Sequence, residues 1–501
     1  MLDRVVVGEL ADKLQAESLR LSRFAQVFEA NQPVPPVPKE AESEKRALAR
    51  LARTPWLRLV VASTAQPLKV SGYRDPERGV DSAMWRTWLR NDMDSRQVQL
   101  NYDVVKYGYG FMCVTPGEDE EGERLATLRP VSPRRMIAEF EDPYMDEYPL
   151  RALRRVSDGK WKYFDADAIY TLEGEPTDFR VTDVVEHDAG VCPVVMFVNH
   201  MDLDGNCFGE IEPYMDVAAR LDLTTNDRLL VQRFNSWKIL YATHIEPPKG
   251  ASAQEKEAAK LKLRNDTMLM GTGDTQFGTL DETSMAPFIA AADADRNDLS
   301  AVTQTPMSML TGEMINLGAD AITNSYRPWR EKLKERVALW GDAHARVFRL
   351  AAAVQGDAEE ARNYDAVVQW EDVEDRSLAQ TADAFGKLAQ MLEVPPEVLW
   401  GRIPGVSQSD VIEWKRLHDE KLRQELQIEA MTVPTPDMTI QLPEPSPDTG
   451  TKQGERTPAS YEDQPKPWGA KRGARMNEVA RARRQRKREA IDGDGDGIVG
   501  E

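Results

Sequence analysis

The strongest periodic signal in the sequence lies between residues 321 and 353. Apolar side chains and one histidine recur there at steps of three and four, at Trp329, Leu333, Val337, Trp340, His344, Val347 and Leu350. Such steps place side chains on one face of an α-helix. At 1.5 Å per residue, about 30 residues form a helix of about 45 Å. The sequence therefore predicts one long helix, followed by a strand at 364–372.

Shorter helical patterns stand at the start of the chain. We expect helices over residues 9–30, over 41–64 and around Trp85, Trp88 and Leu89. The prolines of 31–39 end the first helix, because proline cannot continue one. A short strand and turn are expected at 68–74.

From about residue 102 to 200 the pattern changes to short β-rich runs separated by Gly, Pro and Asp turns. These runs are YGYGFMCVTPGED, ERLATLRPVSP, RALRRVSDGKWKYFDADAIYTLE and CPVVMFVN. They predict a sheet-forming domain. With helices before and after it, the predicted fold class is α+β.

Helical patterns return at residue 211, where the apolar residues lie mostly on one helix face: Ile211, Tyr214, Ala218, Leu221, Leu229 and Phe234. A second helix is expected at 285–302, with Met285, Phe288, Ile289, Ala292, Leu299 and Val302 on one side. Between them, residues 237–283 predict a mixed insert with a strand in WKILYATHI and a charged helix near 252–264. Residues 305–321 predict no helix, and further helices are expected around 378–392, 396–400 and 409–428.

Charge and cysteine content restrict the function classes. The chain has 64 Lys and Arg against 84 Asp and Glu, a formal net charge of −20. Such a surface repels phosphates, so it does not favour tight nucleic-acid binding, although a nucleic acid could still pass without sticking. Cys113, Cys192 and Cys207 show no CxxC spacing, which is typical of a reducing compartment. No apolar run approaches the about 20 residues of a membrane span, and the first residues do not resemble a signal peptide. We therefore expect a soluble intracellular protein without a membrane partner.

Motifs of catalysis are largely missing. The five histidines are scattered, and the sequence holds neither HExxH nor GxSxG. His200, Asp202 and Asp204 alternate in HMDLD, a pattern more typical of a solvated loop than of a metal site. GDTQFGT has the glycine spacing of a phosphate loop, but Thr279 stands where the lysine should be. The sequence therefore predicts no enzyme and no cofactor.

The residues beyond about 430 are polar and proline-rich, and we predict that they are disordered. They carry a basic run in which Glu478 is the one acidic residue. For this run, a contact with nucleic acid or an acidic partner and a solubilising role are equally supported. Its cations are Lys466, Lys471, Arg472, Arg475, Arg481, Arg483, Arg484, Arg486, Lys487 and Arg488. Asp492, Asp494 and Asp496 copy the first ligands of a calcium loop. The printed chain ends before position 12 of that loop, so weak calcium binding is the most we expect.

The order of elements from about residue 50 to 428 resembles the portal proteins of tailed bacteriophages, specifically siphophages. The resemblance is carried by LVVASTAQPLKVSGYR, YGYGFMCVTPGED, LRPVSPRRMIAEFEDPY, HDAGVCPVVMFVNHMDLDGNCFGEIEPYMDVAARLDLTTND, LSAVTQTPMSMLTG and YDAVVQWEDVEDRSLAQTADAFGKL. At 316–322 this chain departs from the family pattern, with Leu317 in place of a serine and Asp320 at the acidic position.

The resemblance implies a division of the chain into parts of a ring-forming subunit. These parts are an N-terminal helical wing region (1–100), a β-rich wing (101–210), stem helices (211–236 and 284–302), a clip (237–283), a tunnel loop (303–320), a long tunnel helix with a wing strand (321–375), a helical crown (376–429) and a tail (430–501). Within the tunnel loop, the residues expected to face DNA are Met307, Met309, Glu313, Met314 and Asn316. The methionines and Asn316 are uncharged and could touch DNA without gripping it, although packing between subunits explains the methionines equally well.

By resemblance, the function is mechanical. Such subunits form a homo-oligomeric ring, usually a dodecamer, at one capsid vertex of the virion, and they are assembled in the host cytoplasm. Double-stranded DNA passes through the ring during packaging and ejection. The implied partners are the terminase, the major capsid protein, the scaffold and the head–tail adaptor proteins.

Two other interpretations stay open. The first is another virion structural protein, such as a minor head or adaptor protein, although the long helix followed by the strand VVQW argues against it. The second is a calcium-dependent or nucleic-acid-processing enzyme, which rests on the tail alone.

Overall fold

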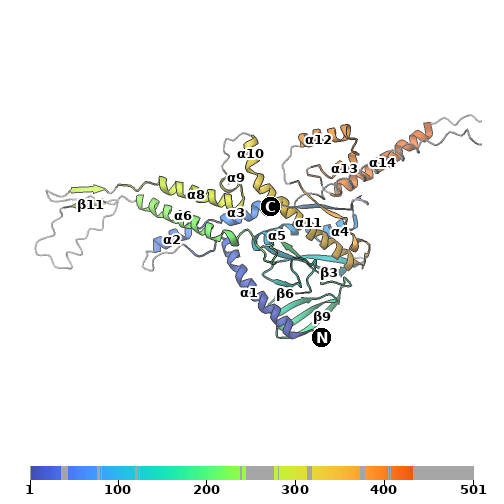
Figure 1. Ribbon diagram of the computed structural model, residues 1–501, viewed down its shortest axis with the longest axis horizontal. Coiled ribbons are helices and arrows are strands. Elements are labelled where there is room, and N and C mark those ends of the chain that lie inside the picture. Colours follow the sequence, from blue (N-terminus) through green and yellow to red (C-terminus); the bar gives the residue numbers. More distant parts are fainter. Residues whose placement is uncertain are drawn as a thin grey trace, which may run out of the picture. The chain divides into compact units, whose positions relative to one another are not determined.

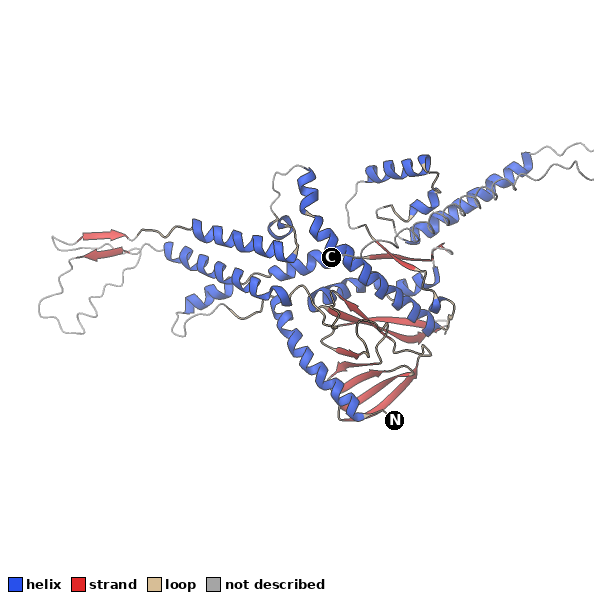
Figure 2. Cartoon of the chain, viewed as in Figure 1, coloured by secondary structure: helices blue, strands red, loops and turns tan. Residues whose placement is uncertain are grey.

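The computed structural model of the protein describes residues 2–34, 43–75, 79–80, 82–118, 122, 124–236, 240–243, 276–279, 281–312, 319–372, 378–403, 405–406 and 408–432. The chain divides into two units, Met1–Ile428 and Glu429–Glu501. The elements below belong to the first unit, apart from the last residues of helix α14. Helices and strands both make up this unit, so the predicted α+β class is confirmed (Figure 2).

Two antiparallel sheets form the predicted β-rich region. The first has the order β10-β3-β4, with strands Val194–Val198, Tyr109–Glu118 and Arg124–Val131. The second is a meander of β5 to β9, over Met136–Glu139, Arg151–Ser157, Lys160–Phe164, Ala168–Glu175 and Asp178–Glu186. Phe111 and Cys113 of the first sheet share a buried cluster with Met136 and Phe164 of the second. The two sheets therefore pack face to face.

Helix α1, Arg4–Phe28, covers the other face of the five-stranded sheet (Figure 1). Asp3 begins the helix, because its side chain accepts a hydrogen bond of 2.9 Å from the backbone N–H of Val5. Val7 and Leu10 then pack against residues that point away from the first sheet, namely Leu153, Tyr163, Leu172 and Phe179. The period of two along each strand thus supplies one apolar face for each neighbour.

Helix α11, Arg327–Gln355, is the long helix that the sequence predicts. Six of the seven predicted apolar-face positions are buried, and Val337 is partly buried. The helix contacts β3, β4 and β10 of the first sheet and also β13, Val367–Trp370. Strand β13 pairs with β1, Val70–Asp75, which pairs in turn with β2, Gly79–Val80, while the short η2, Glu360–Arg362, packs on the helix. Helix α11 therefore packs against two separate sheets, β10-β3-β4 and β13-β1-β2.

Two predicted helices are each broken in two, and proline is the reason in both cases. The predicted 41–64 helix is α2, Ser43–Leu51, and α3, Trp56–Ala65, with Pro55 between them. The predicted 321–353 helix begins as α10, Ala319–Ser325, and restarts at α11, with Pro328 in its first turn. A proline has no N–H for the carbonyl four residues earlier, so it favours a new helix start.

Two helices were not predicted. The first is α5, Met93–Tyr107, which extends into the region where strands were expected. Helix α4 before it, Ser82–Arg90, confirms the helix expected around Trp85. Helix α5 ends at Gly108, whose φ of 97° is readily adopted only by glycine. In the stretch predicted to lack a helix, α9 spans Met307–Thr311 and ends at Gly312, where φ is 71°.

Helices α6, Met215–Asn235, and α8, Ala286–Thr303, confirm the two expected helices but only part of their apolar faces. Ala218, Leu221, Ala292 and Leu299 are buried. In contrast, Phe234 is 54% exposed, and Ile289 and Val302 are each 48% exposed. The two helices pack on each other, and a pair of helices cannot cover apolar surface that faces outward.

The other predicted elements are found near their expected places. Strand β11, Leu240–Thr243, lies within WKILYATHI and pairs with β12, Gln276–Thr279, whereas the charged helix expected near 252–264 lies outside the described residues. Helices α12, Leu378–Met391, α13, Pro396–Trp400, and α14, Gln408–Thr432, follow β13. The tail beyond 432, predicted to be disordered, also lies outside the described residues. No described helix combines the length and the apolar character needed to cross a membrane.

His344 of α11 lies at the centre of the core. Its side chain is fully buried, and its ring packs edge-on against Trp88, Phe197 and Trp370, with centroid distances of 5.4, 4.7 and 5.9 Å. Neither ring nitrogen has a hydrogen-bond partner among the residues that the structure describes. Burial without a partner disfavours the charged imidazolium, so the pKa of His344 falls to about 3.

Acid should therefore destabilise the fold through His344. Below about pH 6.5 this histidine binds a proton in the unfolded chain but not in the folded chain. The free energy of unfolding therefore falls by up to about 1.4 kcal/mol for each pH unit of acidification. We expect His344→Leu to reduce the loss of unfolding free energy between about pH 7.5 and pH 5 by up to about 2 kcal/mol. Urea denaturation at both pH values measures this, with His418→Gln as the exposed control. An unchanged pH dependence in His344→Leu would contradict the explanation.

Candidate functional site

Helices α6 and α8 form an antiparallel pair that leaves the body of the unit and returns to it (Figure 1). Near the body, Arg220 Nε lies 2.8 Å from Asp295 Oδ1, and its Nη2 lies 2.6 Å from Asp298 Oδ2. At the far end, the side chain of Asn235 exchanges two hydrogen bonds with the backbone of Thr283. Polar contacts therefore fasten the pair along its length.

Glu210 stands at the point where the chain leaves for this pair, just before the short helix η1, Glu212–Tyr214. Its backbone N–H donates to Val105 O at 2.8 Å. Gly209 makes this close approach possible, because a Cβ there would lie 2.7 Å from both Gly108 N and Lys106 O. The backbone thus holds the Glu210 carboxylate at a set position beneath α11.

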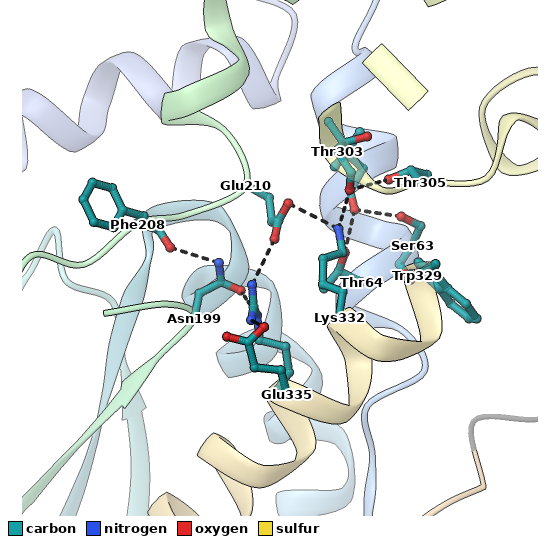
Figure 3. A network of polar contacts seen from close by, with 12 residues as sticks. Ser63, Thr64, Asn199, Phe208, Glu210, Thr303, Thr305, Trp329, Lys332 and Glu335 are labelled. Atoms are coloured by element: carbon teal, nitrogen blue, oxygen red, sulfur yellow. Dashed lines mark hydrogen bonds and ion pairs between the residues drawn. The ribbon is translucent and has the colours of Figure 1, made fainter. Parts of the chain in front are cut away.

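Two cations of α11, Lys332 and Arg336, meet that carboxylate, and Figure 3 labels Lys332 beside Glu210. Lys332 Nζ lies 3.3 Å from Glu210 Oε2, and Arg336 Nη2 lies 3.4 Å from Glu210 Oε1. The three side chains are only 5–6% exposed. Burial lowers the pKa of Lys332, and the Glu210 carboxylate opposes that shift. We call these three residues the buried ion cluster.

Lys332 also holds the end of α8. Its Nζ donates to Thr303 O at 2.8 Å, a carbonyl of the last turn that has no partner within its own helix. A cation at this end is also favoured by the helix dipole. Ser300 Oγ donates to Thr305 O at 2.7 Å, which closes the turn that follows. The start and the end of the α6–α8 excursion are therefore tied to one side chain of α11.

Arg336 extends the cluster to the first sheet. Its Nε donates to Asn199 Oδ1 at 2.7 Å, and Asn199 Nδ2 donates to Phe208 O at 2.9 Å. The half-exposed Glu335 carboxylate lies 3.1 Å from Arg336 Nη1 without the alignment of a hydrogen bond. Two turns earlier, Trp329 Nε1 donates to Ser63 O of α3 at 3.1 Å. Four segments thus meet along about two turns of α11.

This arrangement suits mechanical coupling better than bond-making chemistry. The charged groups face one another rather than a space that could hold a substrate. Among the residues that the structure describes, no group of His, Cys, Asp or Glu side chains is placed to hold a metal ion. The cluster can transmit a displacement of α6 or α8 to α11, because breaking it would leave buried charges unpaired.

The structure describes few of the site residues predicted from sequence. Met307 and Met309 lie on α9, half-buried against the main core. Glu313, Met314 and Asn316 lie outside the described residues, as do the basic run of the tail and Asp492, Asp494 and Asp496. His200 and Asp202 of HMDLD lie in a loop where Asp202 accepts hydrogen bonds from Asp204 and Asn206.

The buried ion cluster was not predicted from the sequence, although one signal for it exists. Lys332 and Arg336 stand one helical turn apart, within the stripe that also contains Trp329, Leu333 and Trp340. A cation on an apolar stripe requires a buried anion. The sequence does not indicate which of its many carboxylates that is.

One comparison with known proteins gives a match. Residues 20–427 match the model of a protein family described as phage portal protein, SPP1 Gp6-like. The match covers nearly all of the unit described above, including α6, α8, α11 and the buried ion cluster. No curated protein matches the chain significantly.

The charge balance of the buried ion cluster predicts different losses of stability for substitutions of its members. Glu210→Gln leaves Lys332 without an anion and Arg336 with only the half-exposed Glu335 carboxylate, so we expect a loss of about 3–5 kcal/mol in unfolding free energy. Lys332→Met keeps the Glu210–Arg336 pair and leaves Thr303 O with only the 3.4 Å hydrogen bond from Thr305 Oγ1, so we expect about 1–3 kcal/mol. Chemical denaturation measures both, and Glu331→Gln on the exposed face of α11 should change stability by less than about 0.5 kcal/mol. Equal losses for Glu210→Gln and Lys332→Met would refute the charge argument.

Proposed function

The chain belongs to the phage portal protein family, and on this premise we propose that its copies close into the ring through which double-stranded DNA enters and leaves the capsid. The single observation that carries the proposal is the family match over residues 20–427. The proposed ring stands at one vertex of the virion, holds twelve copies by resemblance, and is assembled in the host cytoplasm. It needs no cofactor and catalyses no reaction.

In this proposal, α6 and α8 are the stem, and the connection between them, which includes β11 and β12, is the clip that docks the terminase and later the head–tail adaptors. Residues 303–320 form the tunnel loop, α11 is the tunnel helix, and α12 to α14 form the crown. The stem assignment has physical support. Phe234, Ile289 and Val302 are large apolar side chains about half-exposed in a single copy, and neighbouring copies in a ring would cover them.

The net charge also fits the proposed passage of DNA. A duplex is held by cations that displace its counterions, and each such contact strengthens binding. A chain of formal charge −20 offers the moving phosphates few such contacts overall. A closed cyclic assembly encloses the duplex without holding it tightly.

The buried ion cluster has a place in the proposed function. Glu210 begins the segment that enters the stem, and Lys332 of the tunnel helix binds the last turn of the stem helix α8. Through the cluster, a displacement at the clip would reach the tunnel helix and the first sheet together. We include the basic tail in the proposal as a contact with packaged DNA or scaffold inside the capsid, with the major capsid protein around the ring.

The purified full-length chain should form closed rings with a central hole in negative-stain images. Native mass measurement of the same sample should then give the number of copies. A chain that stays monomeric at every protein and salt concentration would refute the proposal. Deletion of residues 430–501 should leave the rings intact, because the family match ends at residue 427.

Two charge variants should separate ring formation from DNA handling. Glu313→Lys adds a cation to the proposed tunnel loop, so it should slow packaging while rings still form. Neutralising the arginines from Arg481 to Arg488 should lower the retention of packaged DNA and leave ring assembly unchanged. The measurements are the DNA content of procapsids filled in vitro and ring images of the same variants. Equal filling and retention in variant and parent capsids would contradict both assignments.

A further inference from the structure

A cluster of cations lies at the border of the two packed sheets. In the register of the five-stranded sheet, Arg154 of β6 stands directly opposite Met136 on one side and Lys162 on the other. Met136 is buried between the sheets, so Arg154 and Lys162 belong to the same inner face. From the other sheet, Arg129 stands opposite Cys113, which is also buried between the sheets. These three residues and Arg135, in the turn before β5, are called the basic cluster.

The members of the basic cluster converge on one place. Burial raises the pKa of the Cys113 thiol to about 12, and Arg154, Arg129 and Lys162 each act against that rise. Burial also lowers the pKa of Arg154, and Arg129 and Arg135 lower it further by repulsion. Arg154 is half-buried while Arg129 and Arg135 are exposed, and their repulsion of a half-buried guanidinium raises the energy of the chain unless an anion joins them.

The single chain supplies no such anion within its described residues. None of Arg129, Arg135, Arg154 and Lys162 has a carboxylate within the 4.0 Å of an ion pair there. Arg154 Nε is buried and has no hydrogen-bond partner in the described part of the chain. In a chain with 84 acidic residues, a group of four cations without a carboxylate partner is unexpected. The described residues therefore leave the cluster open to an anionic partner.

The geometry favours carboxylates of a protein segment over a DNA duplex. Phosphates of a duplex bind cations spread along an extended surface, with their counterions released over many positions. Here the cations meet around one half-buried guanidinium, whose planar fork suits a carboxylate of a short segment.

We infer that the basic cluster binds the acidic segment Glu118–Glu123 of a second copy of this chain. That segment reads EDEEGE, with five carboxylates and no cation, and it leads from β3 into β4. The first residue of this segment, Glu118, lies away from the cluster of its own copy. Glu118 pairs with Arg124, five residues along β4 from Arg129, which is about 17 Å of strand.

The contact is heterologous, since one surface of each copy binds a different surface of the next, and such contacts close into rings. The inference therefore rests on the proposed ring and names one interaction that would help to close it. In this contact, acidic residues that contribute to the negative net charge also bind the arginines of the neighbouring copy.

The test is a charge swap between copies of the full-length chain. Arg154→Glu/Lys162→Glu reverses the cluster, and Glu120→Arg/Glu121→Arg reverses the segment. Each variant alone should weaken assembly about tenfold or more in concentration, measured by sedimentation velocity and negative-stain ring counts. A mixture of the two variants should assemble again, because in alternating copies every cluster meets a segment of opposite charge. Arg180→Glu on the exposed strand β9 is the matched control and should assemble like the parent.

The outcomes separate this inference from the proposed ring. Far-ultraviolet circular dichroism checks that each variant folds. If the cluster variant does not fold, the Glu120→Arg/Glu121→Arg variant alone still tests the inference, because normal assembly of that variant overturns it. A parent chain that never assembles overturns both proposals. Rings that form equally well in all variants overturn only this one, and so does failure of the mixture when both variants fold. Loss of binding to a duplex of about 30 base pairs by the cluster variant, with assembly unchanged, would assign the cluster to nucleic acid instead.

Discussion

One buried carboxylate, that of Glu210, faces two cations inside the core of this protein. Arg336 also faces the half-exposed Glu335, but Lys332 has no second ion-pair partner among the described residues. Without Glu210 the charge of Lys332 would be buried and unpaired, which costs several kcal/mol. The segment that carries Glu210 must therefore lie under α11 before α6 can begin. The same pairing positions Lys332 to take the Thr303 carbonyl, so the return of α8 depends on it as well. The path of the chain through α6 and α8 follows from this requirement for charge balance.

Much of the fold could be predicted because burial on one side leaves a period in the sequence. The face of α11 from Trp329 to Leu350 was predicted almost completely, since it packs on the chain's own strands. The breaks at Pro55 and Pro328 were missed because an apolar pattern continues across them, whereas backbone hydrogen bonding does not. Helix α5 was missed because its last residues resemble the strand that follows. On α6 and α8, Phe234 and Ile289 were expected to be buried, but the chain alone does not cover them.

The candidate site was harder to predict than the fold, for a physical reason. A period of three and four is a local property, whereas the Lys332–Glu210 pair joins residues 122 positions apart. Among 84 acidic side chains, only the folded backbone selects the one that faces Lys332 and Arg336. The resemblance to portal proteins was confirmed by the family match, because it rested on an ordered series of motifs rather than on one contact. The tunnel-loop and tail residues named from sequence remain predictions.

The closeness of the two ends of the α6–α8 excursion has a mechanical consequence. Residue 210 and residue 303 are anchored within one helical turn of α11, at Lys332 and Arg336. Equal forces on the two helices add at that turn and push α11 sideways as a rigid body. When α6 and α8 slide in opposite directions, their forces on α11 cancel. Only a small torque remains, because the two anchor points lie within one helical turn. The anchorage therefore filters motion: it transmits common displacement of the pair and suppresses internal shear.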